Sequence, residues 1–144
     1  MDNFSSKASP PLRIIYLEDH VLFRRPMINM CLKPLVSSLD LIEFDNGDHA
    51  RDFIENGIRN KNKIDLIITD ILHPGIPRNE LVKRIRFYEE KYNSKLRIPI
   101  VVLSMVPESR FPNLMSDKII DAYLAKCAEI DDIIIYLEDL LMTK

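Results

Sequence analysis

Short apolar runs rich in Ile and Val alternate with longer segments whose apolar positions recur at helical spacing. The runs cover residues 12–17, 39–44, 63–69, 98–103 and 122–125. The first, third and fourth runs scarcely alternate between apolar and polar side chains, which is typical of strands buried on both faces. The order βαβαβαβαβα therefore predicts an α/β fold in which helices cover both faces of a parallel sheet.

The segments between the runs predict helices, with three local interruptions. Helical periodicity covers 23–31, 50–54, 81–92 and 130–141. Pro26 lies inside the first of these segments and removes an internal hydrogen bond unless it falls in the first turn. Gly57 is read as the stop signal of the second helix. Segment 107–120 contains Pro112 and little Ala or Leu, so we expect a short or irregular helix there.

Composition favours a single domain without metal or disulfide staples. The chain has 144 residues, a formal charge of -2 and 47% hydrophobic residues, so direct nucleic-acid binding is not expected. No stretch approaches the ~20 apolar residues of a membrane span, and the two cysteines lack metal-ligand spacing. We expect a cytoplasmic protein with a flexible N-terminal tail over 1–11 and one domain over 12–144.

Polar side chains follow the central strands at the points where these strands end. The first strand is followed by Glu18 and Asp19, the third by Asp70, the fourth by Ser104 and the fifth by Lys126. In an open α/β sheet the carboxyl ends of the strands form the edge at which ligands bind. Each residue alone has an ordinary explanation as a turn, cap or surface residue, but their shared position predicts one site.

Three carboxylates in one crevice repel one another unless a cation joins them. Mg²⁺ prefers oxygen ligands and suits two or three carboxylates with a backbone carbonyl. A metal ion and Lys126 together could neutralise a transferring phosphoryl group, with Asp70 as the nucleophile and Ser104 as a hydrogen-bond donor. The pattern thus favours phosphoryl chemistry at Asp70.

Four motifs resemble the receiver domain of bacterial two-component response regulators. They are LEDHVLFRR (17–25), TDILHPG (69–75), VVLS (101–104) and AYLAK (122–126), and the resemblance extends from Leu12 to Leu141. The first motif is similar to receivers that precede a helix-turn-helix output domain, which this sequence does not contain. The resemblance implies a flavodoxin-like doubly wound (βα)5 fold with strand order 2-1-3-4-5, in a stand-alone receiver or a piece of a longer protein.

The resemblance also implies a phospho-acceptor and its metal ligands. Asp70 would accept phosphate from a sensor histidine kinase or a phosphotransfer protein. Mg²⁺ would be held by Asp19, Asp70 and the backbone carbonyl of Leu72, and by Glu18 largely through water. The protein would be a signalling switch and not an enzyme, although its own residues would assist phosphoryl acceptance and self-dephosphorylation.

A switch at the end of the sheet is implied by the same family. Ser104 and Lys126 would contact the phosphoryl group, and Tyr123 matches an aromatic residue that moves inward behind the hydroxyl. Tyr123 could equally be a plain buried aromatic residue. Phosphorylation would alter the face formed by segments 107–120, 122–125 and 130–141, which could bind an output protein or a second copy of the chain.

Several positions depart from the family pattern. Met105 stands where a small residue is usual and could crowd Asp70, and Cys127 replaces the usual proline after the lysine. Leu72 lacks a polar group to orient an attacking water, which favours a long-lived phosphoryl group. Ile135 and Met142 lie opposite the core stripe of the last helix, either as ordinary exposed side chains or as part of a dimer or output face.

Two alternative functions stay open at this point. A phosphorylation-independent protein-binding module would keep the fold, with Met105 and the altered loops disabling the switch. A phosphohydrolase of the haloacid dehalogenase type also uses a strand-end Asp, but it needs a second acid where this chain has Leu72. Metal-dependent phosphorylation of Asp70 distinguishes the first alternative from a phospho-accepting switch.

Overall fold

The computed structural model describes residues 11–18, 21–33, 38–70, 77–126 and 130–142. The expected N-terminal tail lies outside these residues except for Pro11. Asp19, Leu72 and Cys127 also lie outside them, so the roles predicted for these residues have no structural description.

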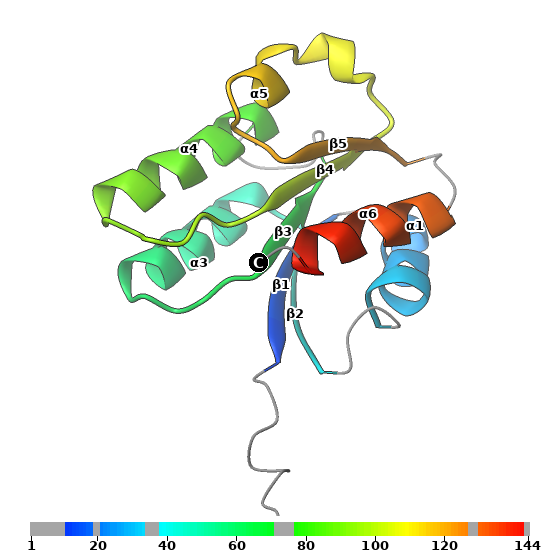
Figure 1. Ribbon diagram of the computed structural model, residues 1–144, viewed down its shortest axis with the longest axis horizontal. Helices are drawn as coiled ribbons and strands as arrows, with labels where there is room; N and C mark the ends of the chain where they lie inside the picture. Colours follow the sequence, from blue (N-terminus) through cyan, green and yellow to red (C-terminus); the bar gives the residue numbers. More distant parts are fainter. Residues whose placement is uncertain (1–10, 19–20, 34–37, 71–76, 127–129, 143–144) are drawn as a thin grey trace, which may run out of the picture.

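Five parallel strands form one sheet in the order β2-β1-β3-β4-β5, which confirms the predicted topology (Figure 1). The strands are β1 (Leu12–Leu17), β2 (Leu39–Phe44), β3 (Leu66–Thr69), β4 (Ile100–Ser104) and β5 (Ala122–Ala125). β4 begins two residues later than predicted because Pro99 has no N–H to donate and the N–H of Ile98 donates to the Glu89 carboxylate at 2.7 Å.

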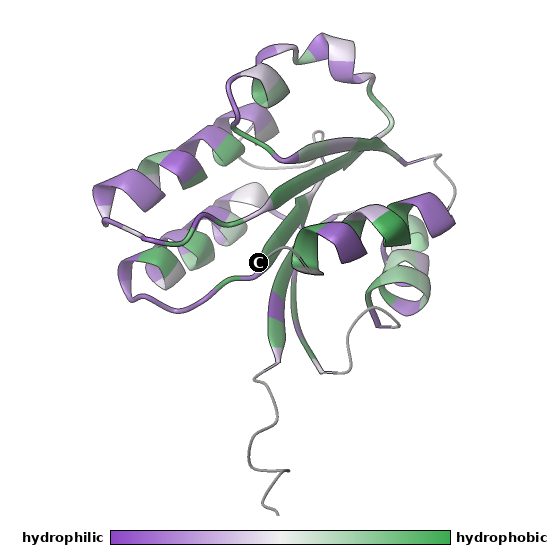
Figure 2. Cartoon of the chain, viewed as in Figure 1, coloured by the Kyte–Doolittle hydropathy of each residue, from purple (hydrophilic) through white to green (hydrophobic). Residues whose placement is uncertain are grey.

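Helices cover both faces of this sheet. They are α1 (Val21–Pro26), η2 (Met27–Leu32), α3 (Gly47–Arg59), α4 (Arg78–Lys91), η3 (Glu108–Arg110), α5 (Asn113–Ser116) and α6 (Ile130–Met142). α3 and α4 pack on one face, whereas α1, η2 and α6 pack on the other (Figure 1). The central strands are mainly apolar, with a hydrophilic band in β1, and the helices alternate between apolar and polar sides (Figure 2).

Alternate residues of β1 pack into two separate apolar layers, one on each face of the sheet. Ile15 and Leu17 pack in the cluster under α3 and α4, while Ile14 and Tyr16 pack in the cluster under η2 and α6. All four residues are at most 1% exposed. Burying such a side chain contributes about 1.5–3 kcal/mol, so this strand is a main source of stability for both layers.

Pro26 lies at a change of helix type. α1 ends at Pro26, and the chain continues through the π-helix η2. Pro26 cannot donate the usual backbone hydrogen bond, and a wider π-turn accommodates the lost bond without ending the helical path. Met27 and Cys31 are buried, as the apolar pattern predicts, and so are Ile28 and Leu32. Met30, which the same pattern placed on the apolar face, is 52% exposed.

The prediction that Gly57 stops a helix is wrong. α3 continues to Arg59, and Gly57 is buried inside it. A Cβ atom on this residue would lie 3.3 Å from Cδ1 of Ile64, so the glycine permits close approach of the segment that leads to β3. The helix instead ends through Lys61, which has a φ of 62° and lets the N–H of Asn62 donate to the carbonyl of Gly57 at 2.8 Å.

The segment between β4 and β5 is irregular, as predicted. It contains only the three-residue η3 and the four-residue α5, with Pro112 directly before α5. Leu114 is the buried residue of α5 and packs in the cluster under α3 and α4. The irregular segment thereby returns the chain to the start of β4, where the N–H of Asp121 donates to the carbonyl of Ile100 at 2.8 Å.

Candidate functional site

Backbone hydrogen bonds extend the sheet by one residue at its carboxyl edge. The N–H of Glu18 donates to the last residue of β2 at 3.1 Å, and the N–H of Asp70 donates to the last residue of β1 at 3.1 Å. The N–H of Lys126 donates to the last residue of β4 at 3.0 Å. The strand ladder itself therefore positions these three residues along one edge.

The side chain of Lys126 joins the two carboxylates at this edge. Its Nζ lies 2.7 Å from Oε1 of Glu18 and also donates a hydrogen bond to Oδ2 of Asp70. Glu18 is fully buried and Asp70 is 6% exposed. Buried carboxylates are costly without a cation, so the ammonium offsets much of the penalty of placing both here.

Lys126 is held in its charged form by these contacts. Burial alone lowers the pKa of Lys126, but hydrogen bonds and charge interactions with Asp70 and Glu18 outweigh it, so the pKa lies above its ordinary value. The Phe23 ring of α1 adds a cation–π contact, with its centroid 4.8 Å from Nζ. Phe23 was read from the sequence only as a helical core position, because its contact with Lys126 joins residues far apart in the chain.

Ser104 and Tyr123 both form hydrogen bonds with the backbone of Val106. The Oγ of Ser104 accepts a hydrogen bond from the N–H of Val106 at 2.9 Å, and the hydroxyl of Tyr123 donates to the carbonyl of Val106 at 2.7 Å. Sequence reasoning missed Val106, since a backbone group at that position carries no side-chain signal. These bonds fix the start of the irregular segment to the end of β4 and to β5.

Residues of the candidate site also influence the pKa of the Tyr123 hydroxyl. Burial is the largest cause that raises the pKa of Tyr123, the hydrogen-bonding influence of Ser104 lowers it, and the charge of Asp70 raises it again. The side chain is partly buried and packs against the apolar cluster under α3 and α4, so both interpretations of Tyr123 stay open.

Arg24 of α1 fastens the backbone that carries Glu18. Its Nη1 donates to the carbonyl of Glu18 at 3.0 Å, and its Nε lies 3.2 Å from Oε1 of Glu43 on β2. The sequence motif contains Arg24, but its partner on β2 is revealed only by the folded sheet. The contact links α1 to the edge at which Lys126 lies.

Met105 directly follows Ser104 and is 74% exposed. Most of its surface thus faces solvent, and crowding of Asp70 by this side chain stays a prediction.

Cys31 is a buried residue of η2, and burial and the charge of Asp131 raise the pKa of its thiol. A raised pKa keeps this thiol protonated and unreactive.

Two of the four expected magnesium ligands belong to the described residues. Glu18 and Asp70 lie close enough to share Lys126, whereas Asp19 and Leu72 fall outside that part of the chain. Within the described ranges no group of three His, Cys, Asp or Glu residues is placed to hold a metal ion. Carboxylate oxygens are nevertheless the donors that Mg²⁺ prefers, and the two negative charges exceed the single positive charge of Lys126.

Two curated plant proteins are similar in sequence. The chain is 29% identical over 110 residues to the Two-component response regulator ARR17 of Arabidopsis thaliana, a match that covers 72% of the chain and 67% of that protein. It is 31% identical over 109 residues to ARR15 of the same plant, covering 71% of the chain and 49% of that relative. The chain thus spans about half the length of ARR15. No protein-family model matches the sequence.

Solved structures share the fold at lower identity. The signal receiver domain of the response regulator NarL from Mycobacterium tuberculosis superposes with a TM-score of 0.71 and 20% identity, covering 94% of this chain and 100% of that one. The receiver domain of the histidine kinase CKI1 from Arabidopsis thaliana, complexed with Mg²⁺ and BeF3⁻, gives 0.70 and 22%, covering 89% of each chain. The chain has the receiver-domain fold of two-component response regulators.

The sequence relatives of the chain are plant proteins, so the bacterial origin expected from the motifs lacks support. Receivers of plant and bacterial proteins both share its fold. Within the described part of the chain, no helix is long and apolar enough to span a membrane.

Proposed function

We propose that this receiver domain is a phospho-accepting switch of a two-component or phosphorelay system. The observation that carries this proposal is Lys126, whose ammonium contacts both Glu18 and Asp70 at the carboxyl edge of the sheet. Ser104 ends the neighbouring strand at the same edge. An acid nucleophile, a cation and a hydroxyl donor are the groups that phosphoryl transfer to a carboxylate requires.

Asp70 is the proposed acceptor. One carboxylate oxygen attacks the phosphorus of a phosphohistidine, a P–O bond forms, and the P–N bond breaks to leave the donor imidazole. Lys126 and the Ser104 hydroxyl then interact with the phosphoryl oxygens, which stabilises the charge carried by them. The low exposure of Asp70 limits water around the acyl phosphate and slows its hydrolysis.

Mg²⁺ is the proposed cofactor, held by Glu18 and Asp70 together with Asp19 and the Leu72 carbonyl. The acidic excess of Glu18 and Asp70 over Lys126 supports this assignment. When bound, the ion supplies positive charge that neutralises phosphoryl oxygens. The chain's own residues orient the Asp70 carboxylate and shield the ion pairs of Lys126 from solvent.

Tyr123 and Ser104 form the proposed switch. If the Ser104 hydroxyl turns toward a phosphoryl group, it no longer accepts from the N–H of Val106, and the bond from Tyr123 to the Val106 carbonyl is left to hold the loop alone. The irregular segment with η3 and α5, together with β5 and α6, is therefore the surface that changes on phosphorylation. An output protein or a second copy of the chain would read this surface.

The donor is proposed to be a sensor histidine kinase or a phosphotransfer protein. A small apolar depression of about 80 Å³ lies beside Lys126, lined by residues of α1, η2 and α6. Leu22 at its rim is 93% exposed. A partner that rests on this surface would bring a phosphohistidine close to Asp70, and an exposed apolar side chain suits such a docking contact.

Intact-protein mass after incubation with a small acyl-phosphate donor, with and without Mg²⁺, tests the proposal. We expect the mass of one phosphoryl group to be gained only with Mg²⁺, and to be lost in Asp70→Asn. Asp65→Asn is the matched control because Asp65 is 4% exposed on the approach to the same strand, and an Asn oxygen still accepts from the N–H of Arg13. This variant should gain phosphate like the wild type.

The same experiment separates the alternative function. No mass gain in the wild type, together with failure to bind a beryllofluoride mimic, would support a phosphorylation-independent binding module. In that case Met105→Ala is the variant to examine next, because the exposed Met105 directly follows Ser104. Turnover of phosphate esters would instead indicate a phosphohydrolase.

A further inference from the structure

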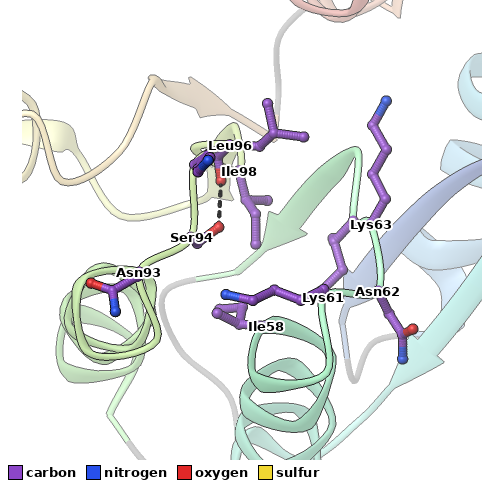
Figure 3. Close-up of a pocket in the computed structure, with 10 residues that line it drawn as sticks. Ile58, Lys61, Asn62, Lys63, Asn93, Ser94, Leu96 and Ile98 are labelled. Carbon is purple, nitrogen blue, oxygen red and sulfur yellow. Dashed lines mark hydrogen bonds between the residues drawn. The ribbon is translucent and has the colours of Figure 1, made fainter.

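A groove lies at the amino edge of the sheet, at the opposite end from Asp70, and Figure 3 shows the residues that line it. It is formed by the segments that follow α3 and α4, with lining residues within 58–64 and 93–98, and its volume is about 320 Å³. No residue of the proposed phosphoryl site contributes to it. The function proposed for Asp70 therefore leaves this groove unexplained.

The lining of the groove is apolar at its base and basic at its rim. Leu96 is 64% exposed and lies beside the buried Ile98. The charged residues among the described lining are Lys61, Lys63 and Lys95. The lining itself contains no acidic residue, although the exposed Lys63 lies 3.5 Å from the buried Asp65 carboxylate. Such a surface suits an apolar group surrounded by negative charge.

The backbone holds the groove open in a defined shape. Lys61 has a φ of 62° at the end of α3, and Asn93 has a φ of 53° beyond the end of α4. Lys61 reaches across from the α3 side (Figure 3), and its Nζ donates to the carbonyl of Tyr92 on the other side. A preformed groove costs little conformational entropy when it is filled.

α6 presents the complementary surface. Ile135 is 63% exposed and projects from the solvent side of the helix. Asp131, Asp132, Glu138 and Asp139 stand three or four residues from it, so their exposed carboxylates surround it on the helix surface. The described part of α6 contains no basic residue. The helix thus offers one apolar side chain within a ring of four acids.

We propose that Ile135 of one copy of this chain inserts into the lysine-rimmed groove of a second copy. α6 covers the face of the sheet opposite to α3 and α4, so the helix cannot fill the groove of its own chain (Figure 1). Leu96 would pack against Ile135, while Lys61, Lys63 and Lys95 would face the carboxylates of α6. Every copy of the chain thus carries both surfaces of the contact, the groove and the acidic helix.

The contact is heterologous, because the groove of one copy meets the helix of the next. Each copy keeps one unused groove or helix, so association continues head to tail instead of stopping at a symmetric dimer. A single apolar side chain with surface charges gives a weak contact, so association should appear at concentrations near ~1 mM. It should decline as salt rises from about 0.05 M to about 0.5 M, because exposed ion pairs are screened.

Two variants that each disable one surface test the proposal by sedimentation velocity. Lys95→Glu combined with Leu96→Asp disables the groove, and Ile135→Lys disables the helix. All three side chains are exposed, so circular dichroism and melting should match the wild type. Phe87→Asp is the matched control, because Phe87 is an exposed apolar residue of α4 that lines neither surface.

We expect each disabled variant alone to stay monomeric, and an equimolar mixture of the two to form a 1:1 complex that grows no further. In the mixture, amide resonances of 58–64 and 93–98 should shift in the labelled Ile135→Lys protein. Loss of association in Ile135→Lys with full retention in the groove variant would indicate symmetric pairing of α6 and overturn the proposal. A wild type that stays monomeric near ~1 mM would overturn it as well. Asp70→Asn should associate normally, so this result is independent of the phosphoryl site.

Discussion

The ammonium of Lys126 lies 2.7 Å from the carboxylate of Glu18, although the two residues lie 108 positions apart in the chain. The same ammonium contacts Asp70, so one cation joins the ends of three strands. The pair is almost fully buried, with side-chain exposures of 6% and 0%. Stability and the proposed chemistry therefore depend on the same charge.

Replacing Lys126 by Met should destabilise the fold. The side chains of Glu18 and Asp70 would lose the cation they share inside the protein, and breaking a buried ion pair from one side costs about 3–5 kcal/mol. Denaturant unfolding at neutral pH measures this loss. Lys83→Met is the control, because Lys83 is an exposed residue of α4 and its removal should change little.

Mg²⁺ should partly rescue Lys126→Met, because the ion supplies positive charge to the same carboxylates. The unfolding midpoint of the variant is expected to rise more with Mg²⁺ than that of the wild type. Equal shifts in both proteins would show that the ion does not bind where Lys126 acts.

The two hydrogen bonds to Val106 can be separated by substitution. Ser104→Ala and Tyr123→Phe each remove one bond and should each lower the free energy of unfolding by about 1 kcal/mol. Only Ser104→Ala should slow phosphorylation by an acyl-phosphate donor, because the hydroxyl of Tyr123 is bound to the loop. Rates from a mass time course test this, and a slowing of similar size in both variants would contradict it.

Stability should fall at alkaline pH. Burial and the charges of Glu18 and Asp70 raise the pKa of Tyr16, and contacts with Asp70 and Glu18 raise the pKa of Lys126. A group with a raised pKa in the fold stabilises fully below its unfolded value, and this contribution is lost as pH rises through the folded pKa. The unfolded values lie near 10 for Tyr and about 10.4 for Lys, so the decline should begin above about pH 10.

Tyr16→Phe should reduce this decline. The Tyr16 hydroxyl is buried and has no hydrogen-bond partner among the described residues, so its removal should leave stability at neutral pH unchanged or slightly higher. Unfolding free energies of both proteins across pH 7 to about 11 provide the comparison. An unchanged alkaline decline in Tyr16→Phe would assign it to other groups.

Gly57 and Ile64 should show energetic coupling. Gly57→Ala gains helix propensity of about 1 kcal/mol, but the new Cβ would lie 3.3 Å from Cδ1 of Ile64. Ile64→Val removes that methyl group. The double variant should therefore be more stable than the sum of the single changes by about 0.5–1 kcal/mol, and additive values would show that Ile64 adjusts without cost.

The apolar pattern was sufficient to predict five parallel strands and their helical covers. Strands buried on both faces need nearly continuous apolar side chains, and a parallel sheet needs a crossover between consecutive strands, so both features are recorded locally. Pro112 likewise indicated the irregular segment before β5. Gly57 was misread because a helix-ending glycine and a close-packed glycine look the same without the neighbouring Ile64.

Sequence by itself determined which residues end the strands of this protein, and therefore that Glu18, Asp70, Ser104 and Lys126 share one edge. Only the tertiary structure decided how they pair, since a hydrogen bond or an ion pair depends on distances between chain segments that sequence spacing does not encode. The contact of the Phe23 ring with Lys126 and the hydrogen bonds of Ser104 and Tyr123 to Val106 are of this kind. So is the groove at the amino edge, because its floor and rim come together only when the ends of two helices pack side by side.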